Sequence, residues 1–181
     1  MPSSPEYRSI ALIADTHGHL DPRVAELSLP CDLIIHAGDI GNGAILRTLA
    51  QHGAEVVAVA GNNDTPRHWP ADDQAELADL PDTASVSLPG GTLVIDHGHR
   101  FAARDRHRRL RARYRDAAAV VCGHSHRPAA DTAGLPWILN PGAAGRTRTY
   151  GGPACLLLEI GADGWVLHPH RFEPQSARAA S

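Results

Sequence analysis

The chain has 181 residues, of which 43% are apolar, and this length and composition predict a single globular domain that buries its own core. No segment approaches the ~18 to 20 uninterrupted apolar residues of a membrane helix, and the opening residues MPSSPEYRS lack the charged and apolar regions of a secretory signal, so we expect neither membrane insertion nor export. A net charge of -3 excludes a global basic field that would recruit nucleic acid.

The ordered domain is expected to span residues 8–172, with flexible tails at residues 1–7 and 173–181, because both ends are rich in small and polar residues. Three cysteines, Cys31, Cys122 and Cys155, lie far apart within apolar runs. Their odd number and spacing predict small buried side chains in a reducing compartment, which favours a cytoplasmic location.

Five short apolar runs predict buried strands, at residues 9–14, 33–37, 55–60, 92–96 and 118–122. Between the second and third runs, the segment GNGAILRTLAQHG predicts a helix with Asn42 as N-cap and Gly53 as terminator. This alternation predicts a largely parallel sheet in the first half, whereas turn signals at 89–91, 133–134 and 162–164 predict antiparallel hairpins in the second half. We therefore expect an α/β fold, a two-sheet mixed β-sandwich flanked by helices.

Two further segments each allow two interpretations. Residues 66–81 predict an irregular loop with a short helix over the site, or alternatively a solvated connection. Eight of the 17 basic residues, all arginines, fall between Arg100 and Arg115. This run could contact nucleic acid, but we favour a solvated helix whose apolar side chains, Phe101, Leu110 and Tyr114, face the core.

Polar clusters follow the strands, and their residue types indicate metal chemistry. The carboxyl ends of strands in open α/β sheets converge on one crevice, where ligands bind. Imidazoles mixed with carboxylates suit Mn, Fe, Zn, Co or Ni, and the candidates are too numerous for one tetrahedral ion. Each motif alone also fits an ordinary turn, whereas all of them in this order point to a dinuclear site. The clusters are Asp15-Thr16-His17-Gly18-His19, Gly38-Asp39, Gly61-Asn62-Asn63-Asp64, Asp96-His97-Gly98-His99 and Gly123-His124-Ser125-His126.

Taken together, these motifs resemble the calcineurin-like metallophosphoesterase family, whose pattern is D-x-H, G-D, G-N-H-[DE], a later H, and G-H-x-H. The resemblance continues to Asn140-Pro141-Gly142, which is similar to the N-P-G segment of YfcE-type small phosphodiesterases. It implies two divalent transition-metal ions per chain, with Mn favoured over Ni, Co, Fe or Zn, and Asp39 as the bridging carboxylate. It implies one metal held by Asp15, His17, Asp39 and His126, and the other by Asp39, Asn62, His97 and His124.

The family's catalytic positions correspond here to Asp39, Asn62, Asn63, Asp64 and His97. One of them departs from the commonest pattern, because Asn63 stands where a histidine is thought to protonate the leaving group, and an amide cannot do so. We therefore expect that the substrate has a good leaving group, or that the leaving group is protonated by water, by His19 or by His99. With no imidazole at position 63 to orient, Asp64 is not expected to fill the supporting role that this position has in the family.

The expected reaction is hydrolysis of a small phosphodiester by a hydroxide that bridges the metals, in a pocket that stays net positive and attracts phosphate. Arg100, Arg146 and Arg148 are candidates for gripping a phosphoryl oxygen. The alternatives are a phosphomonoesterase or nucleotidase, and a non-catalytic protein-binding scaffold similar to a retromer subunit of the same fold. A homo-oligomer formed through hairpin strands near the C-terminus is a further possibility, whereas a membrane partner is not expected.

Overall fold

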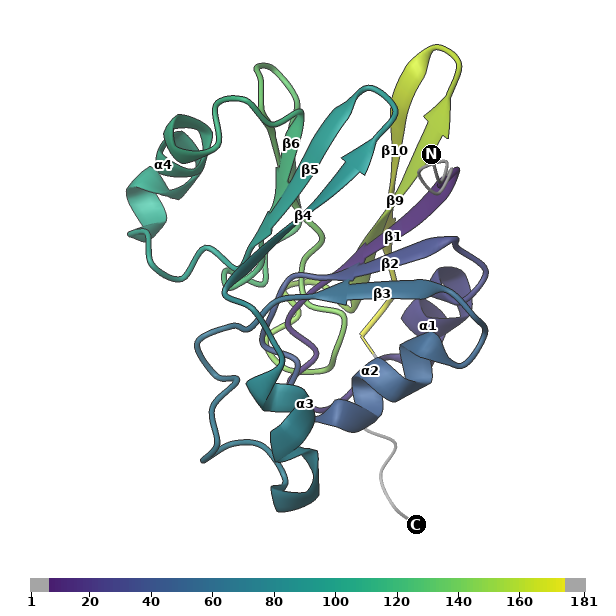
Figure 1. Ribbon diagram of the computed structural model, residues 1–181, viewed down its shortest axis with the longest axis vertical. Helices are drawn as coiled ribbons and strands as arrows, with labels where there is room; N and C mark the ends of the chain where they lie inside the picture. Colours follow the sequence, from purple (N-terminus) through teal and green to yellow (C-terminus); the bar gives the residue numbers. More distant parts are fainter. Residues whose placement is uncertain (1–6, 175–181) are drawn as a thin grey trace.

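A computed structural model describes residues 7–174, which form two five-stranded β-sheets with helices on both outer faces (Figure 1). The first sheet has the order β10-β9-β1-β2-β3 and the second the order β4-β5-β6-β8-β7. This architecture confirms the expected two-sheet α/β sandwich. The remaining residues of the two predicted tails, 1–6 and 175–181, lie outside the described part, while Tyr7 is buried and donates a hydrogen bond to Glu55.

The first sheet combines a parallel half with an antiparallel hairpin. Its parallel strands β1, β2 and β3 correspond to the first three predicted runs, and β9 pairs antiparallel with both β1 and β10. The turn between β9 and β10 lies at the predicted position. The strands of this sheet are β1 (Ser9–Ile13), β2 (Leu33–His36), β3 (Glu55–Ala58), β9 (Ala154–Gly161) and β10 (Gly164–Arg171).

The second sheet contains both predicted hairpins, β4-β5 and β7-β8, but its middle is parallel. Helix α4 connects β5 to β6 and returns the chain to the same sheet edge, so β5, β6 and β8 run in one direction. Three carboxyl ends therefore meet at that edge. The strands are β4 (Thr83–Leu88), β5 (Gly91–Asp96), β6 (Ala119–Val121), β7 (Ala129–Asp131) and β8 (Trp137–Asn140).

Within residues 7–174, four α-helices and two 3₁₀ turns cover the sheets. The predicted helix is α2, and the Asn42 side chain caps it by accepting from the backbone N–H of Ile45. In Figure 1, α1 and α2 lie outside the first sheet and α4 lies outside the second. The elements are α1 (Pro22–Ser28), α2 (Gly43–Ala50), η1 (Ala71–Asp73), α3 (Gln74–Ala78), η2 (Ala103–Asp105) and α4 (Arg106–Arg113).

Apolar side chains fill three layers. The central core packs one sheet against the other, a second core lies between the first sheet and α1 to α3, and a third lies under α4. Burial on both faces explains why the inner strands are continuous apolar runs rather than alternating ones. The three cysteines are free and buried, as expected, and no helix in the described residues is long and apolar enough to cross a membrane.

The two ambiguous segments are now defined. In the arginine run, Leu110 is fully buried and Phe101 and Tyr114 pack beside it, as the solvated-helix interpretation predicted. Arg106 is an exception to that interpretation, because it is buried and donates to the backbone carbonyl of Gly98. The segment 66–81 contains the short helix α3, as the first interpretation predicted. It is not a solvated connection, because Trp69 and Leu77 are buried in the core under the first sheet.

Candidate metal centre

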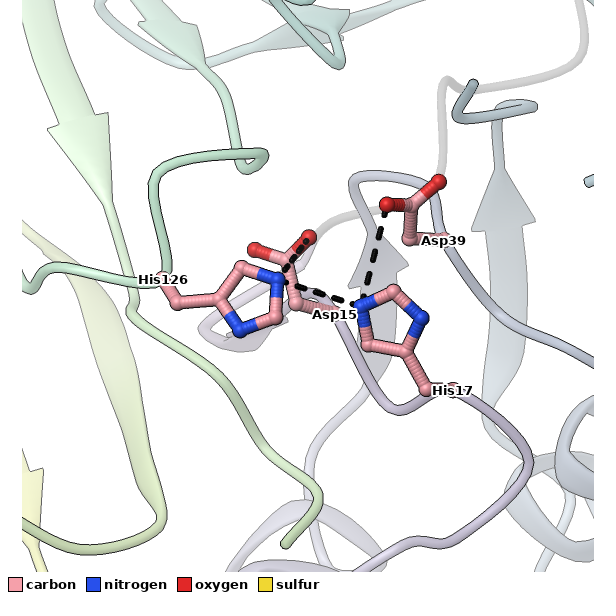
Figure 2. Close-up of side chains that lie close together, drawn as sticks. All are labelled: Asp15, His17, Asp39 and His126. Carbon is pink, nitrogen blue, oxygen red and sulfur yellow. Dashed lines mark hydrogen bonds and ion pairs between the residues drawn. The ribbon is translucent and has the colours of Figure 1, made fainter. Parts of the chain in front are cut away.

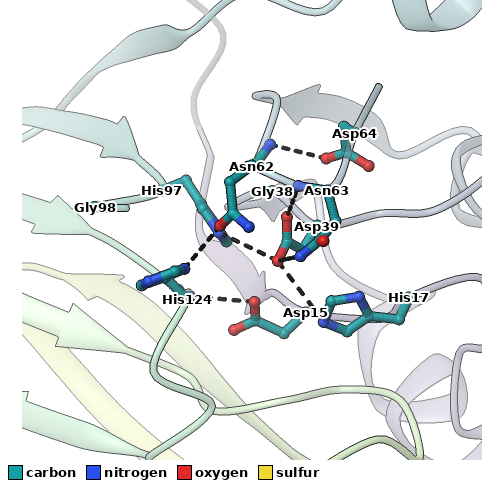
Figure 3. Close-up of polar contacts among 12 residues, drawn as sticks. Asp15, His17, Gly38, Asp39, Asn62, Asn63, Asp64, His97, Gly98 and His124 are labelled. Atoms are coloured by element: carbon teal, nitrogen blue, oxygen red, sulfur yellow. Dashed lines mark hydrogen bonds and ion pairs between the residues drawn. The ribbon is translucent and has the colours of Figure 1, made fainter. Parts of the chain in front are cut away.

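The predicted ligands lie on the loops that leave the carboxyl ends of strands in both sheets (Figure 3). Five of them have left-handed backbone conformations, with φ between 46° and 66°. Such conformations cost of order 1–3 kcal/mol each in non-glycine residues and concentrate at functional sites. The five residues are Asp15, His17, Asp39, His124 and His126.

Backbone hydrogen bonds hold these loops together, and glycine residues allow them to approach closely. The N–H groups of Asp15 and His17 donate to the carbonyls of Gly38 and Asp39, at 3.0 and 2.9 Å. A β-carbon on Gly61 would lie 2.2 Å from Oδ1 of Asp39. The glycine in the G-N motif is therefore required by the close approach of the ligand beside it.

The first ligand group consists of Asp15, His17, Asp39 and His126, which offer ligand atoms within 4.8 Å of one another (Figure 2). The Nε2 atoms of His17 and His126 are 3.1 Å apart. Nε2 of His126 lies 3.6 Å from Oδ1 of Asp15, and Nε2 of His17 lies 3.7 Å from Oδ2 of Asp39. Two imidazoles and two carboxylates thus converge on one point.

The second ligand group consists of Asp39, His97 and His124, and it shares Asp39 with the first (Figure 3). Nε2 of His97 lies 3.4 Å from Oδ2 of Asp39. The remaining predicted ligand, Asn62, is placed beside this group because its Oδ1 lies 2.8 Å from Nδ1 of His124. The fold therefore brings all seven predicted metal ligands together, and Asp39 belongs to both groups.

The chemistry of the donor atoms fits divalent cations. Nδ1 of His97 donates to the carbonyl of Ala37 at 2.7 Å, which turns its buried Nε2 toward Asp39 without a hydrogen-bond partner. Oδ2 of Asp15 is also buried and unpartnered. Unsatisfied buried polar atoms are costly, and a cation at each of the two ligand groups would satisfy them.

The electrostatics of the carboxylates are strongly perturbed. Burial raises the pKa of Asp15 to about 7, although the charge of His97 opposes the shift. Burial acts in the same direction on Asp39, but interactions with His97 and hydrogen bonds from Asn63 hold the pKa of this carboxyl well below its usual range. The same interaction with Asp39 raises the pKa of His97 against the effect of burial. A cation bound there would compete with protons for these groups.

Asn63 and Asp64 have different surroundings. Asn63 donates to both oxygens of Asp39, from its backbone N–H and from Nδ2, at 2.8 Å each. Asp64 is buried and accepts from the N–H groups of Ile40, Gly41 and Gly61 and from Nε1 of Trp69. Asp64 therefore ties together the loops that carry Asp39 and Asn62, and its carboxylate is saturated without an imidazole partner.

Several arginines and histidines were also candidates. Arg100 pairs with exposed Asp82 at 2.7 Å, whereas Arg148 donates to Nε2 of His126 at 3.2 Å. The ring of His99 lies 5.4 Å from that of His97, and within the described residues His19 makes no side-chain contact with a ligand. Sequence reasoning missed Asn140, whose side chain donates to the carbonyl of Gly123 and to Ser125 and so supports the turn that carries His124 and His126. The N-P-G motif marked its position but not this contact.

Comparison with known proteins establishes the family. Residues 9–163 match the model of the calcineurin-like phosphoesterase superfamily domain, so the chain belongs to this superfamily. A probable metallophosphoesterase of Methanocaldococcus jannaschii is 31% identical over 139 residues, covering 74% of this chain and 67% of the relative. A phosphodiesterase of the same organism is 26% identical over 141 residues, covering 74% of this chain and 82% of the relative.

Solved structures show the same fold. An archaeal phosphodiesterase superimposes with a TM-score of 0.67 at 21% identity, covering 90% of this chain and 99% of that one. Vps29 of Entamoeba histolytica, in complex with Zn²⁺, superimposes with a TM-score of 0.65 at 21% identity, covering 91% of this chain and 98% of that one. The fold therefore occurs both in a phosphodiesterase and in a protein named for vacuolar sorting, so the choice between them must come from the site.

Proposed function

We propose that the chain is a dinuclear metal-dependent phosphodiesterase that hydrolyses small phosphodiesters. The observation that carries this proposal is the pair of ligand groups that share Asp39, with unpartnered ligand atoms on Asp15 and His97. When bound there, two divalent cations would activate a water molecule as the nucleophile and stabilise charge on the phosphoryl oxygens. Manganese is favoured, with Ni, Co, Fe and Zn as alternatives that the same ligands accept.

The protein's own residues hold the reacting groups in place. Asp15 and Asp39 bring two negative charges, fewer than the four positive charges of two dications, so the pocket attracts an anionic phosphoester. Asn63 orients Asp39 through its two hydrogen bonds. Because both donors of Asn63 point at Asp39 and an amide is not an acid, the leaving group must be stable as an anion or take a proton from elsewhere.

The relatives support the diester over the monoester, since one of them is named a phosphodiesterase. The scaffold alternative is supported by the likeness to Vps29, which shows the fold alone. Against a purely structural role stands the cost of burying Oδ2 of Asp15 without a hydrogen-bond partner, which a bound cation would offset.

Turnover with defined metals tests the proposal. We expect metal-free protein to be inactive, and protein refilled with Mn to hydrolyse bis-p-nitrophenyl phosphate faster than p-nitrophenyl phosphate. Faster turnover of the monoester would favour a phosphomonoesterase. Protein that holds two ions yet turns over neither compound would favour the scaffold.

A further inference from the structure

Backbone strain extends beyond the ligands to one neighbouring loop. Among the described residues, seven that are not glycine have positive φ; five are the ligands named above, and the others are Arg148 and Tyr150. Their φ values are 51° and 43°, in the left-handed region that side chains with a β-carbon avoid. A cost of order 1–3 kcal/mol for each persists only where the surroundings impose it.

This loop, residues 143–152, is fixed to the ligand loops. The N–H of Ala144 donates to the carbonyl of Ala14 at 2.8 Å, and a β-carbon on Gly145 would lie 2.4 Å from the carbonyl oxygen of Thr16. The carbonyl of Thr147 accepts from Nδ1 of His126 at 2.9 Å. The side chains that follow Thr147 are thus presented beside the first ligand group by a backbone that cannot drift from it.

The guanidinium of Arg148 points at the first ligand group, where it contacts His126. A guanidinium can only donate, so the 3.2 Å contact between Arg148 and His126 uses the Nε2 lone pair that a cation would take. A bound cation would release the guanidinium while the backbone keeps it close. Arg146, two residues earlier and also exposed, makes no contact with a ligand within residues 7–174.

Tyr150, two residues after Arg148, forms an aromatic surface on the same loop. Its ring stacks under the guanidinium of Arg127, with 4.1 Å from Cζ to the ring centroid, and Arg127 directly follows the ligand His126. Even so, Tyr150 remains 48% exposed, one of three large apolar residues in the described chain that stay exposed. A flat ring, backed on one side by Arg127 and open to solvent, can stack an aromatic group at little cost in side-chain entropy.

We propose that Arg148, Tyr150 and Arg127 form a substrate subsite for phosphoesters that carry a flat aromatic group, an aryl ring or a nucleobase. Arg148 binds a non-bridging phosphoryl oxygen, and the ring of Tyr150, held by Arg127, stacks the aromatic group. The inference rests on the proposed function, because the phosphoryl group must first lie at the metal centre.

Calorimetric binding to the full, Mn-loaded chain tests the subsite without requiring turnover. The probes are methyl phosphate, phenyl phosphate and thymidine 5′-monophosphate, which share a phosphate and differ in the group attached. We expect the two aromatic probes to bind more tightly than methyl phosphate. Tyr150→Ala should weaken the aromatic probes roughly tenfold and leave methyl phosphate unchanged, and Tyr150→Phe should retain the preference.

The arginine has its own matched control. Arg148→Gln should weaken all three probes by one common factor of about tenfold, since it removes a charge-assisted contact to phosphate, while Arg146→Gln, which removes the same charge from the same loop, should change them much less. A gain for thymidine alone would support the subsite and narrow it to nucleosides.

Two results would overturn the inference. Equal binding of all three probes to the Mn-loaded chain, or an equal loss for all three in Tyr150→Ala, would show that no aromatic group is stacked there while leaving the dinuclear site intact. A chain that holds no Mn before the probes are added would reject the proposed function, and the subsite with it.

Discussion

The two ligand groups that share Asp39 differ in charge and in rigidity. Besides Asp39, the first ligand group contains another carboxylate, the fully buried Asp15. The second ligand group has instead the exposed amide of Asn62 beside it. In the first group, Nδ1 of His126 is fixed by the carbonyl of Thr147. In the second, His97 is fixed by Ala37, but His124 is held by Asn62, which is itself exposed.

If two cations bind as proposed, this difference indicates that their affinities should not be equal. Two carboxylates attract a dication more strongly than one, and ligands held by buried partners lose less entropy when they bind. The first cation should therefore bind more tightly, and the second should exchange more readily. Substitutions in each ligand group test this difference in affinity.

The largest effect is expected from the residue that both groups share. Asp39→Asn removes the bridging charge, so metal content should fall at both positions and activity should drop by at least about 10³-fold, the equivalent of several kcal/mol of charge stabilisation. Metal analysis and turnover of bis-p-nitrophenyl phosphate on the same preparation measure both. A variant that kept two ions would show that Asp39 does not bridge.

Changing one group at a time should separate the two cations. Asn62→Ala should weaken the second cation by roughly tenfold to a hundredfold, by analogy with the loss of a supporting group, and leave the first in place. His17→Ala should instead lower the affinity of the tighter site. Isothermal titration with Mn²⁺ reports both affinities. If the two variants lost the same affinity at the same site, the two ligand groups would not differ as described.

Acidity should also distinguish the buried carboxylate of the first group. Folding raises the pKa of Asp15 from 3.8 to about 7, so the metal-free folded chain binds more protons than the unfolded chain in this window. Its contribution to stability is therefore present at low pH and is lost as pH rises from about 4 to 7, by roughly 1 kcal/mol per pH unit. Urea unfolding of metal-free protein at pH 5 and pH 7 measures this loss. Between these two pH values, the free energy of unfolding should decrease less for Asp15→Asn than for wild type.

The smallest effect concerns the support beneath both groups. Trp69→Phe keeps the buried ring but removes the indole donor to Asp64, and should destabilise the chain by about 1–2 kcal/mol with a modest loss of activity. Chemical denaturation measures the loss. Trp165→Phe is a matched control, because it also removes an indole donor, here to the carbonyl of Pro89, which is not among the predicted site residues. It should leave activity unchanged.

Local patterns were sufficient to predict β1, β2, β3, β5 and β6 and the polar clusters that follow them, because burial on both faces leaves apolar runs. The other strands of the described residues were indicated only by the turn signals of the predicted hairpins. The helix capped by Asn42 was predicted for the same kind of reason. Arg106, Trp69 and Asn140 were different: each side chain donates across a loop to a residue 5 to 17 positions earlier, Gly98, Asp64 and Gly123, and no apolar run or turn motif predicts that contact. The contact of Arg148 with His126 likewise depends on two loops meeting.

The central claim is that Asp39 joins two cations into one centre, and electron paramagnetic resonance of the chain titrated with Mn²⁺ tests it most directly. The account predicts that the first equivalent gives the signal of an isolated ion and the second converts it to the multiline signal of a spin-coupled pair. Saturation at one equivalent, or two equivalents that both retain the isolated signal, would contradict it.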